Sequence, residues 1–288
     1  IYIFLGAGLS FGITRGRLLF EDYTYNDDLR FPSWPQLIDR MKNRLRHVPI
    51  LSGHEPSIDR FFAENGPLDS AEVFRTYMGE SQYIDFLRDQ FRTRQDDQRH
   101  LTNSHHALVN LPVRELFTTN YDNLIELAYA TLGIVPTVSS SGKRFLVHAQ
   151  ESNLHLVKLH GTIDDPGSVV LTRSDYARSR HEREEMFKYL LAKLKLASFL
   201  FVGFSLSDPN FTILHDEARY AMDGASPTSY VVQSRSDPLR DSYLRSLGVN
   251  AISLDSWEYL PIFLRAINPE IDLGSVQGNP WAYHTMRN

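Results

Sequence analysis

Short apolar runs alternate with segments of helical periodicity along most of this chain. The apolar runs are rich in β-branched and aromatic residues and predict buried parallel strands over residues 1–6, 113–119, 154–160, 167–172, 198–205, 228–233 and 250–255. Helical patterns are found over residues 122–133, 182–197, 207–222, 237–248 and 257–267. Because strands alternate with helices of this length, we predict an α/β fold, a Rossmann-like parallel sheet with helices on both faces.

The stretch between the first two strands has helical periodicity and no convincing strand. Ser33 is a suitable N-cap for a helix in which Leu37, Met41 and Leu45 recur on one face. Further short helices are predicted around residues 58–65, 70–77, 82–92 and 104–110. We therefore divide the chain into a sheet domain, an inserted helical module and a C-terminal tail, which comprise residues 1–32 with 100–267, residues 33–99, and residues 268–288 respectively.

Composition narrows the classes of function. Hydrophobic residues make up 42% and charged residues 23% of the 288 positions, which predicts an ordinary globular core. The net charge of −5 gives no electrostatic footprint for nucleic acid, so direct nucleic-acid binding is not expected. The chain has no cysteine, which excludes disulfides, thiolate zinc sites, iron–sulfur clusters and cysteine nucleophiles.

Two further observations bear on location. No apolar run reaches the roughly eighteen residues of a membrane span, and the lack of cysteine fits a reducing compartment, so we expect a cytoplasmic protein without membrane contact. The chain opens with "IYIFLG" and has no initiating Met, so we expect its true N-terminus, with any targeting signal, to lie upstream.

Candidate chemistry gathers at the ends of four predicted strands. The loops read "GAGLS" after the first strand, "TTNYD" after the second, "HG" after "LHLVKL", and "GFSLSD" after "FLFV". In an open parallel sheet, ligands bind beyond the carboxyl ends of the strands. These four loops are therefore expected to meet at one edge of the sheet.

Each loop alone has an ordinary explanation as well as a functional one. Glycines at 6, 8 and 12 suit either a phosphate-binding loop or a tight turn, and their spacing is one residue longer than the dinucleotide fingerprint. Asn120 and Asp122 are good helix caps, although two polar groups exceed what one cap needs. Gly203 and Ser205 suit a ribose or phosphate contact. His160 alone is explained by a hydrogen bond to backbone.

A metal site is not expected. His148, His155 and His160 have no spacing typical of metal ligands, and the "HEREE" segment lacks the second histidine of the HExxH motif.

Taken together and in chain order, the four loops resemble the sirtuin signature of GAG-x-S, T-Q-N-x-D, H-G and G-x-S. The resemblance covers the sheet from Ile1 to Leu206 and continues to about Ile267. This chain departs from the sirtuin deacylases in three ways: it lacks the four cysteines of their zinc module, it has Thr119 in place of Gln, and it has no GIPxFR segment after the first loop. Phrases such as "KLHGTIDDPGSVVLTRSDY" resemble the zinc-free, sirtuin-like branch, whose members consume NAD in bacterial antiphage defence.

The resemblance implies an NAD hydrolase that cleaves the nicotinamide–ribose bond to give nicotinamide and ADP-ribose, with NAD as substrate and no metal. It implies catalytic roles for Asn120, His160 and Asp122. In this hypothesis Asn120 orients water or the carboxamide, Asp122 holds the site or faces the developing cation, and His160 accepts a proton from water or a ribose hydroxyl. The remaining residues implied for NAD binding are Gly6, Ala7, Gly8, Ser10, Thr119, Gly161, Gly203 and Ser205.

Other functions remain open at this stage. A non-catalytic NAD or ADP-ribose sensor would keep the glycine loop and need neither Asn nor His at the strand ends. A zinc-free deacylase or ADP-ribosyltransferase is a third reading. A dehydrogenase is a fourth, and it lacks the acidic strand end expected for the NAD ribose.

An unregulated enzyme of this kind would be toxic, so gating is expected. The helical module and the C-terminal tail are the expected surfaces for homo-oligomer formation or partner binding. The family resemblance implies a HerA-type ATPase, an Argonaute-like protein or a phage trigger as partner.

Overall fold

The computed structural model describes residues 1–12, 31–93, 101–148 and 154–268. Its centre is a seven-stranded parallel sheet with the order β3-β4-β2-β1-β5-β6-β7. The strands are β1 (Tyr2–Leu5), β2 (Glu115–Thr118), β3 (Thr137–Ser139), β4 (His155–Lys158), β5 (Phe199–Val202), β6 (Ser229–Gln233) and β7 (Val249–Ser253). The predicted α/β, Rossmann-like class is confirmed.

The central strand β1 lies at the point where the order of strands in the sheet reverses, with later strands added first on one side of it and then on the other. β1 pairs with β2 on one side and with β5 on the other. Strands β2, β3 and β4 fill one half of the sheet, and β5, β6 and β7 fill the other. In open α/β sheets the ligand crevice forms at such a switch point. The loops after β1, β2 and β5 are therefore neighbours.

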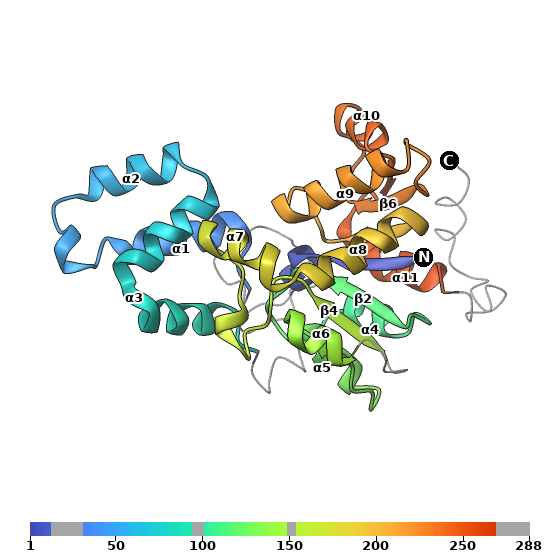
Figure 1. Cartoon of the computed structure of the whole chain (residues 1–288), viewed down its shortest axis with the longest axis horizontal. Helices are drawn as coiled ribbons and strands as arrows, with labels where there is room; N and C mark the ends of the chain where they lie inside the picture. The colour runs from blue at the N-terminus through green and yellow to red at the C-terminus, as the bar shows by residue number, and fades with distance from the viewer. Residues whose placement is uncertain (13–30, 94–100, 149–153, 269–288) are drawn as a thin grey trace.

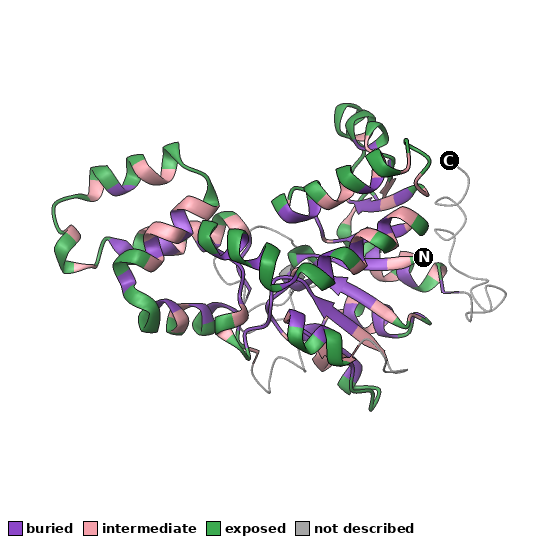
Figure 2. Cartoon of the chain, viewed as in Figure 1, coloured by how far each residue is buried: buried purple, intermediate pink, exposed green. Residues whose placement is uncertain are grey.

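Alternation along the strands sends side chains to two separate cores, as expected for a pleated strand buried on both faces. In β1, Phe4 joins one cluster while Ile3 and Leu5 join the other. Figure 2 shows that burial is concentrated in the strands and on the inward sides of the helices around them.

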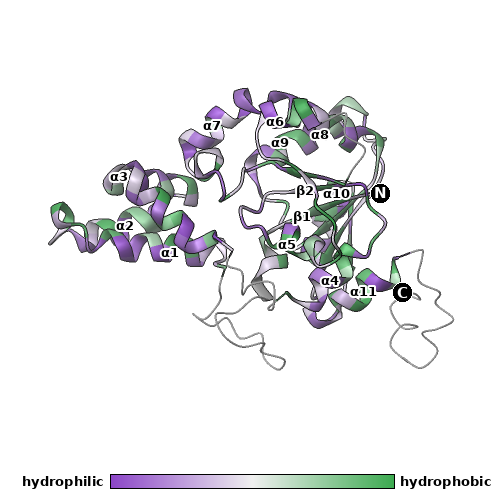
Figure 3. Cartoon of the chain, turned by 90° about the horizontal axis from the view of Figure 1, so that it is seen from below, coloured by the Kyte–Doolittle hydropathy of each residue, from purple (hydrophilic) through white to green (hydrophobic). Residues whose placement is uncertain are grey.

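Helices cover both faces of the sheet, as predicted (Figures 1 and 3). One core contains residues of α4 (Asn103–Val109), α5 (Leu124–Ala130) and α11 (Leu260–Ala266). The other core contains residues of α6 (Gly142–His148), α8 (Glu184–Leu196), α9 (Pro209–Ala221) and α10 (Pro238–Ser246). Short 3₁₀ turns lie at Ala7–Gly12 (η1), Pro49–Leu51 (η2), Pro166–Ser168 (η4) and Trp257–Tyr259 (η5).

The described part of the stretch between β1 and β2 contains no strand. Besides α4, its α-helices are α1 (Trp34–Leu45), α2 (Glu55–Glu64) and α3 (Pro67–Phe91), which in Figure 1 extend to the left of the sheet. Ser33 caps α1, as predicted, by accepting from the Gln36 amide. The two helices expected around 70–77 and 82–92 form α3, which kinks where Gly79 adopts a φ of 72°.

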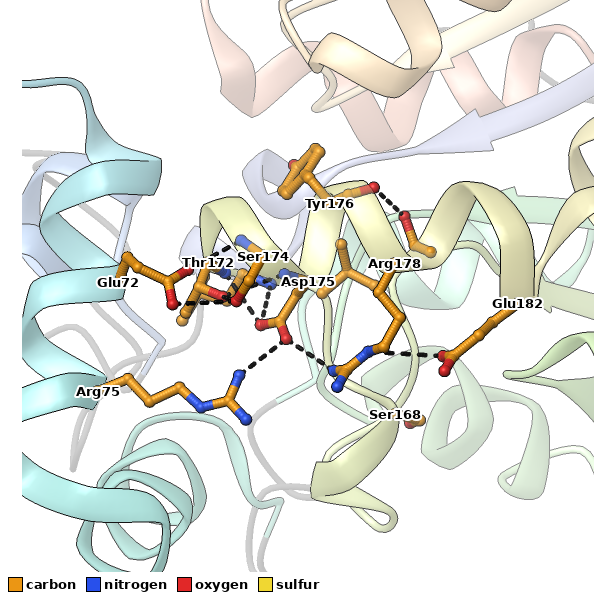
Figure 4. Close-up of polar contacts among 12 residues, drawn as sticks. Glu72, Arg75, Ser168, Thr172, Ser174, Asp175, Tyr176, Arg178 and Glu182 are labelled. Carbon is orange, nitrogen blue, oxygen red and sulfur yellow. Dashed lines mark hydrogen bonds and ion pairs between the residues drawn. The ribbon is translucent and has the colours of Figure 1, made fainter.

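Ion pairs fasten α3 to α7 (Arg173–Glu182). Figure 4 shows Glu72 and Arg75 of α3 pointing toward the first turn of α7. Arg75 donates to the buried Asp175 at 3.0 Å, and the Ser174 amide donates to Glu72 at 2.8 Å. Residues of α1, α3 and one face of the sheet also belong to one buried apolar cluster. The inserted helices are therefore held both by polar contacts with α7 and by apolar contacts.

Two strand predictions differ from the structure. The strand expected over residues 167–172 is wrong: η4 and an irregular turn occupy this stretch, and Pro166 with Gly167 favours a turn over a strand. Conversely, the short β3 at the sheet edge was missed because three residues are too few to show a period. The predicted tail from residue 268 lies, except for Asn268, outside the described residues.

No helix in the described ranges is long and apolar enough to cross a membrane.

Candidate functional site

The loops that follow β1 and β5 are packed backbone against backbone. The Gly6 amide donates to the Val202 carbonyl at 3.0 Å, and the Gly8 amide donates to the Gly203 carbonyl at 2.9 Å. A Cβ on Gly203 would lie 2.5 Å from the Leu9 nitrogen, and Gly203 itself adopts a φ of +64°. Glycine is therefore required here by the close approach of two loops as well as by its conformation.

This packing bears on the predicted phosphate loop. Ala7 and Gly8 are exposed at the carboxyl edge, whereas Gly6 is buried. The amides of Gly6 and Gly8 already donate to protein carbonyls. Of the three backbone amides expected to bind phosphate, those of Gly6 and Gly8 are therefore already used in hydrogen bonds to the end of β5 and its loop, and the amide of Ala7 is the remaining one.

Asn120 ties the β2 loop to the β1 loop. Its side-chain Nδ2 donates to the Gly6 carbonyl and to Ser10 Oγ, both at 3.2 Å. A carbonyl can only accept, so these contacts fix which end of the amide faces the β1 loop. Asn120 Oδ1 is buried and has no hydrogen-bond partner among the described residues. An unpaired buried acceptor costs about 1–3 kcal/mol, which a ligand that donates a hydrogen bond would remove.

Asp122 belongs to the same cluster. Ser10 Oγ donates to its Oδ2 at 2.9 Å, and the Leu124 amide at the start of α5 donates to its Oδ1 at 3.1 Å. Burial raises the pKa of Asp122, and this effect exceeds the opposing influence of the Lys158 charge and the two hydrogen bonds. The ordinary capping role is therefore present, together with a direct contact to the β1 loop.

His160 is the second residue after the end of β4, and it is almost fully buried. Its ring is nearly parallel to that of Tyr121, at a centroid distance of 6.5 Å, and meets the Tyr176 ring edge-on at 5.2 Å. Its Nε2 lies 3.3 Å from Asp208 Oδ2. Gly161, which follows it, adopts a φ of +83°, which favours glycine at that turn.

Asp208 is the cap of α9 and also the centre of a polar cluster. Tyr176 Oη donates to its Oδ2 at 2.6 Å, and the Phe211 amide donates to its Oδ1 at 2.9 Å. Burial alone would raise the pKa of Asp208, but the charge of His160 and the hydrogen bonds from His160, Tyr176 and Phe211 lower it. Asp208 is thus a buried carboxylate with a positive or polar group at each oxygen.

Lys158, at the end of β4, is fully buried beneath the Asn120–Asp122 loop. Its ammonium donates to the Asp122 carbonyl at 2.6 Å, to Asn123 Oδ1 at 3.2 Å and to Glu126 Oε1 at 2.8 Å. Burial raises the pKa of Glu126, and Lys158 opposes that rise. Lys158 therefore holds the loop after β2 in place through its hydrogen bonds to Asp122 and Asn123.

The predicted residues therefore fall into two groups at one edge of the sheet. Asn120 and Asp122 join Gly6 and Ser10, while His160 joins the β5–α9 loop. Tyr121, between Asn120 and Asp122 in sequence, lies against the His160 ring and connects the two groups. The other predicted binding residues are at the margins: the Thr119 amide donates to the Leu5 carbonyl at 3.4 Å, and Ser205 is exposed with its hydroxyl 2.6 Å from that of Ser207.

Three neighbours were not predicted as site residues. Asp208 caps α9, and its contact with His160 comes in addition to that role. Lys158 had a visible signal, a charged residue inside the apolar run "LHLVKL". Tyr176 had none, because its position depends on how α7 packs. The described residues hold no cluster of His, Cys, Asp and Glu suited to a metal ion.

Comparison with known family models covers three of the four loops, those after β2, β4 and β5. Residues 114–252, which include Asn120, Asp122, His160 and Asp208, match the model of the SIR2-like domain. This part of the chain is similar to SIR2-like domains. The sirtuin-like resemblance drawn from the four loops is confirmed.

Among similar proteins, the chain is 27% identical over 223 residues to NAD(+) hydrolase ThsA of Enterococcus faecium, an alignment that covers 76% of the chain and 40% of that protein. It is 32% identical over 123 residues to NAD(+) hydrolase ThsA of Bacillus cereus, covering 43% and 26%. It is 23% identical over 269 residues to Defense-associated sirtuin 2 of Bacillus subtilis, covering 90% and 24%. The chain thus spans less than half the length of these relatives.

Proposed function

We propose that this SIR2-like chain hydrolyses NAD to nicotinamide and ADP-ribose. The observation that carries the proposal is the Oδ1 of Asn120, a buried acceptor at the switch point of the sheet that has no hydrogen-bond partner in the described part of the chain. The names of the relatives as NAD(+) hydrolases support it.

The reaction breaks the bond between the nicotinamide nitrogen and ribose C1′, and the electron pair of that bond stays on nicotinamide. Water forms a new bond to C1′, and its second proton leaves. Because the leaving group carries a positive charge that it loses on departure, it needs little acid assistance. The protein must place the water and stabilise the cationic sugar.

Asn120 and Asp122 are suited to that task in different ways. The Asn120 Nδ2 is held by Gly6 and Ser10, so Oδ1 is left to accept a hydrogen bond from water or from a ribose hydroxyl. Asp122 holds Ser10 in place and, when ionised, supplies negative charge near a developing cation. Both roles use groups fixed before substrate arrives.

His160 is proposed as the base. A neutral imidazole has a ring nitrogen that can accept a proton from water, and such a base is worth about 10²–10⁴-fold in rate. In this scheme the water proton moves to the ring nitrogen that does not face Asp208. NAD itself is proposed to lie along the edge formed by the exposed Ala7, Gly8 and Ser205 and the partly buried Thr119 and Gly203. Ser10, Gly6 and Gly161 would shape the turns beneath it.

The test is NAD turnover by the purified chain, followed as nicotinamide and ADP-ribose. Asn120→Ala and His160→Ala are expected to lower turnover at least about 10²-fold. The exposed Asn43→Ala and His181→Ala serve as matched controls and should retain it. Full activity in both site variants would overturn the assignment.

The same experiment separates the alternatives. Calorimetric binding of NAD with no product after long incubation would identify a sensor or scaffold. Product formation only with an acyl-lysine peptide would identify a deacylase.

The biological role is proposed on the same basis. Relatives named as a hydrolase and as a defence-associated sirtuin support an NAD-depleting role in antiphage defence, in the cytoplasm. A homo-oligomer, or a complex with a HerA-type ATPase or an Argonaute-like protein, would supply the gating such an activity needs. Light scattering with and without a neighbouring gene product tests this.

A further inference from the structure

We propose that Asp208, assisted by Tyr176, is a positioning residue for His160 that holds its Nε2–H and presents Nδ1 to the reacting groups. This inference deepens the proposed hydrolase function and rests on His160 acting there. It assigns a task to a residue that helix capping would otherwise fully explain.

A second helix cap in the same chain shows that an aspartate can cap a helix without contacting side chains from other elements through its second oxygen. The sequence "SDP" occurs twice, with Asp208 before α9 and Asp237 before α10. Asp237 Oδ1 alone accepts the amides of Leu239 and Arg240, both at 3.0 Å. Asp208 uses Oδ1 for its cap, which leaves Oδ2 to meet two side chains from other elements.

The geometry around Oδ2 defines the direction of each contact. Tyr176 Oη lies 2.6 Å away and His160 Nε2 lies 3.3 Å away. Burial and the neighbouring carboxylate raise the pKa of Tyr176, which keeps its hydroxyl a donor, and the pKa of Asp208 is lowered, which keeps it an acceptor. A carboxylate that accepts from Tyr176 can bind neutral His160 only through an Nε2–H.

Burial makes this contact effective. The side chains of His160 and Asp208 are 4% and 10% exposed, so solvent screens their interaction weakly. The rings of Tyr121 and Tyr176 contact the imidazole and limit its rotation. The histidine is therefore oriented by one charge and two rings.

The consequence concerns the free nitrogen. With the proton on Nε2, Nδ1 carries the lone pair, and it makes no hydrogen bond to any residue in the described ranges. When Nδ1 takes the proton from water, the resulting imidazolium lies beside a carboxylate that stays ionised. No proton passes to Asp208, which acts only by orientation and charge.

The experiment compares Asp208→Asn and Tyr176→Phe with Asp237→Asn in the full chain. Asparagine caps helices about as well as aspartate, so Asp208→Asn keeps the α9 cap. With its Oδ1 on the Phe211 amide, however, it turns an NH₂ group toward His160. Asp237→Asn makes the same chemical change at a matched cap far from the site.

The first measurement is the ring nitrogen spectrum of His160 by NMR, which needs no NAD. Neutral His160 is expected as the Nε2–H tautomer in the wild type and in Asp237→Asn. Asp208→Asn should shift it toward the Nδ1–H tautomer. An unchanged tautomer in Asp208→Asn overturns the proposal, whatever the chain does to NAD.

The second measurement is the split between kcat and KM for NAD. Asp208→Asn is expected to lower kcat at least about 10²-fold with KM changed by less than about threefold, as for the wrong tautomer in a His-Asp pair. Tyr176→Phe should cost about tenfold. Wild-type inactivity would count against the proposed function alone, whereas an active wild type with an equally active Asp208→Asn would overturn this proposal alone.

Discussion

The side-chain Nδ2 of Asn120 donates to the carbonyl oxygen of Gly6 at 3.2 Å, joining the loops that leave two neighbouring strands. The same carbonyl belongs to a turn that rests on the β5 loop through the Gly6 and Gly8 amides. Three strand ends are thus connected through one glycine-rich turn. The position of the Asn120 carboxamide depends on that turn being closed.

We expect Gly6→Ala to lower NAD turnover at least about tenfold. A Cβ at this position would lie 2.6 Å from the Phe204 Cα, so the two loops must separate. Overpacking of this kind costs about 1–3 kcal/mol of stability. Turnover and urea unfolding measured on the same preparation test both effects.

Gly167→Ala is the matched control for that variant. The nearest atom to a Cβ there is an Asp165 carboxylate oxygen at 3.8 Å, an ordinary contact. Wild-type behaviour is expected for it. If Gly6→Ala behaved in the same way, the close packing of the two loops would not matter for the site.

Lys158→Met is expected to destabilise the chain by about 3–5 kcal/mol, because it leaves Glu126, whose side chain is only 20% exposed, without its charged partner. Loss of the ammonium also removes an influence that lowers the pKa of Asp122 and Glu126. The double variant with Glu126→Gln should recover much of the loss. Urea unfolding of the two single variants and the double variant forms the cycle that measures the coupling.

An exposed ion pair provides the comparison. Lys188 and Glu184 are 58% and 60% exposed, so Lys188→Met should change the unfolding free energy by less than about 1 kcal/mol. Equal costs at the buried and exposed lysines would contradict a structural role for Lys158.

Most of the architecture follows from periodicity, because strands buried on both faces leave apolar runs. Runs such as "IFL" and "FLFV" gave β1 and β5 directly. The turn at Pro166–Ser168 was mistaken for part of a strand because "VVL" beside it is apolar for another reason: Val169, Val170 and Leu171 are buried although they belong to no strand. Local patterns report burial and do not identify what covers a residue.

The candidate site shows a similar division. Asn120, Asp122 and His160 follow strands directly, so the sheet topology places them without further information. The neighbours of His160 come from the packing of α7 and α9, which joins positions 160, 176 and 208. No local pattern encodes such contacts between distant segments.

Arg75→Leu is expected to weaken the attachment of α3 to α7 and to destabilise the chain by about 1–3 kcal/mol. It removes a donor from Asp175, whose side chain is 2% exposed, while Arg178 remains as a second donor. The more exposed pair of Arg46 and Asp59 supplies the control, and Arg46→Leu should cost less than about 1 kcal/mol. Chemical unfolding of the two variants measures both losses of unfolding free energy. Equal losses would contradict a stabilising role for the contact between α3 and α7.

The last prediction concerns pH and a histidine outside the site. His105 in α4 is completely buried, and burial, with a smaller effect of His106, lowers its pKa to about 3. The unfolded chain takes up a proton near the ordinary value of 6.5, but the folded chain does not until near 3. The contribution of His105 to stability is therefore complete above about pH 6.5 and is lost as the pH falls from there toward 3. Its slope can reach about 1.4 kcal/mol per pH unit.

His105→Gln isolates this effect, because glutamine suits the third position of a capping box and does not titrate. Its side chain can replace the contact of His105 Nδ1 with Thr102. Unfolding free energies of the two proteins, measured from pH 8 to pH 4.5, should diverge below about pH 6.5, with the wild type losing more. The buried carboxyl groups of Asp122 and Glu126 are present in both proteins and cancel in the difference. Parallel curves would show that His105 takes up its proton equally well in the folded chain.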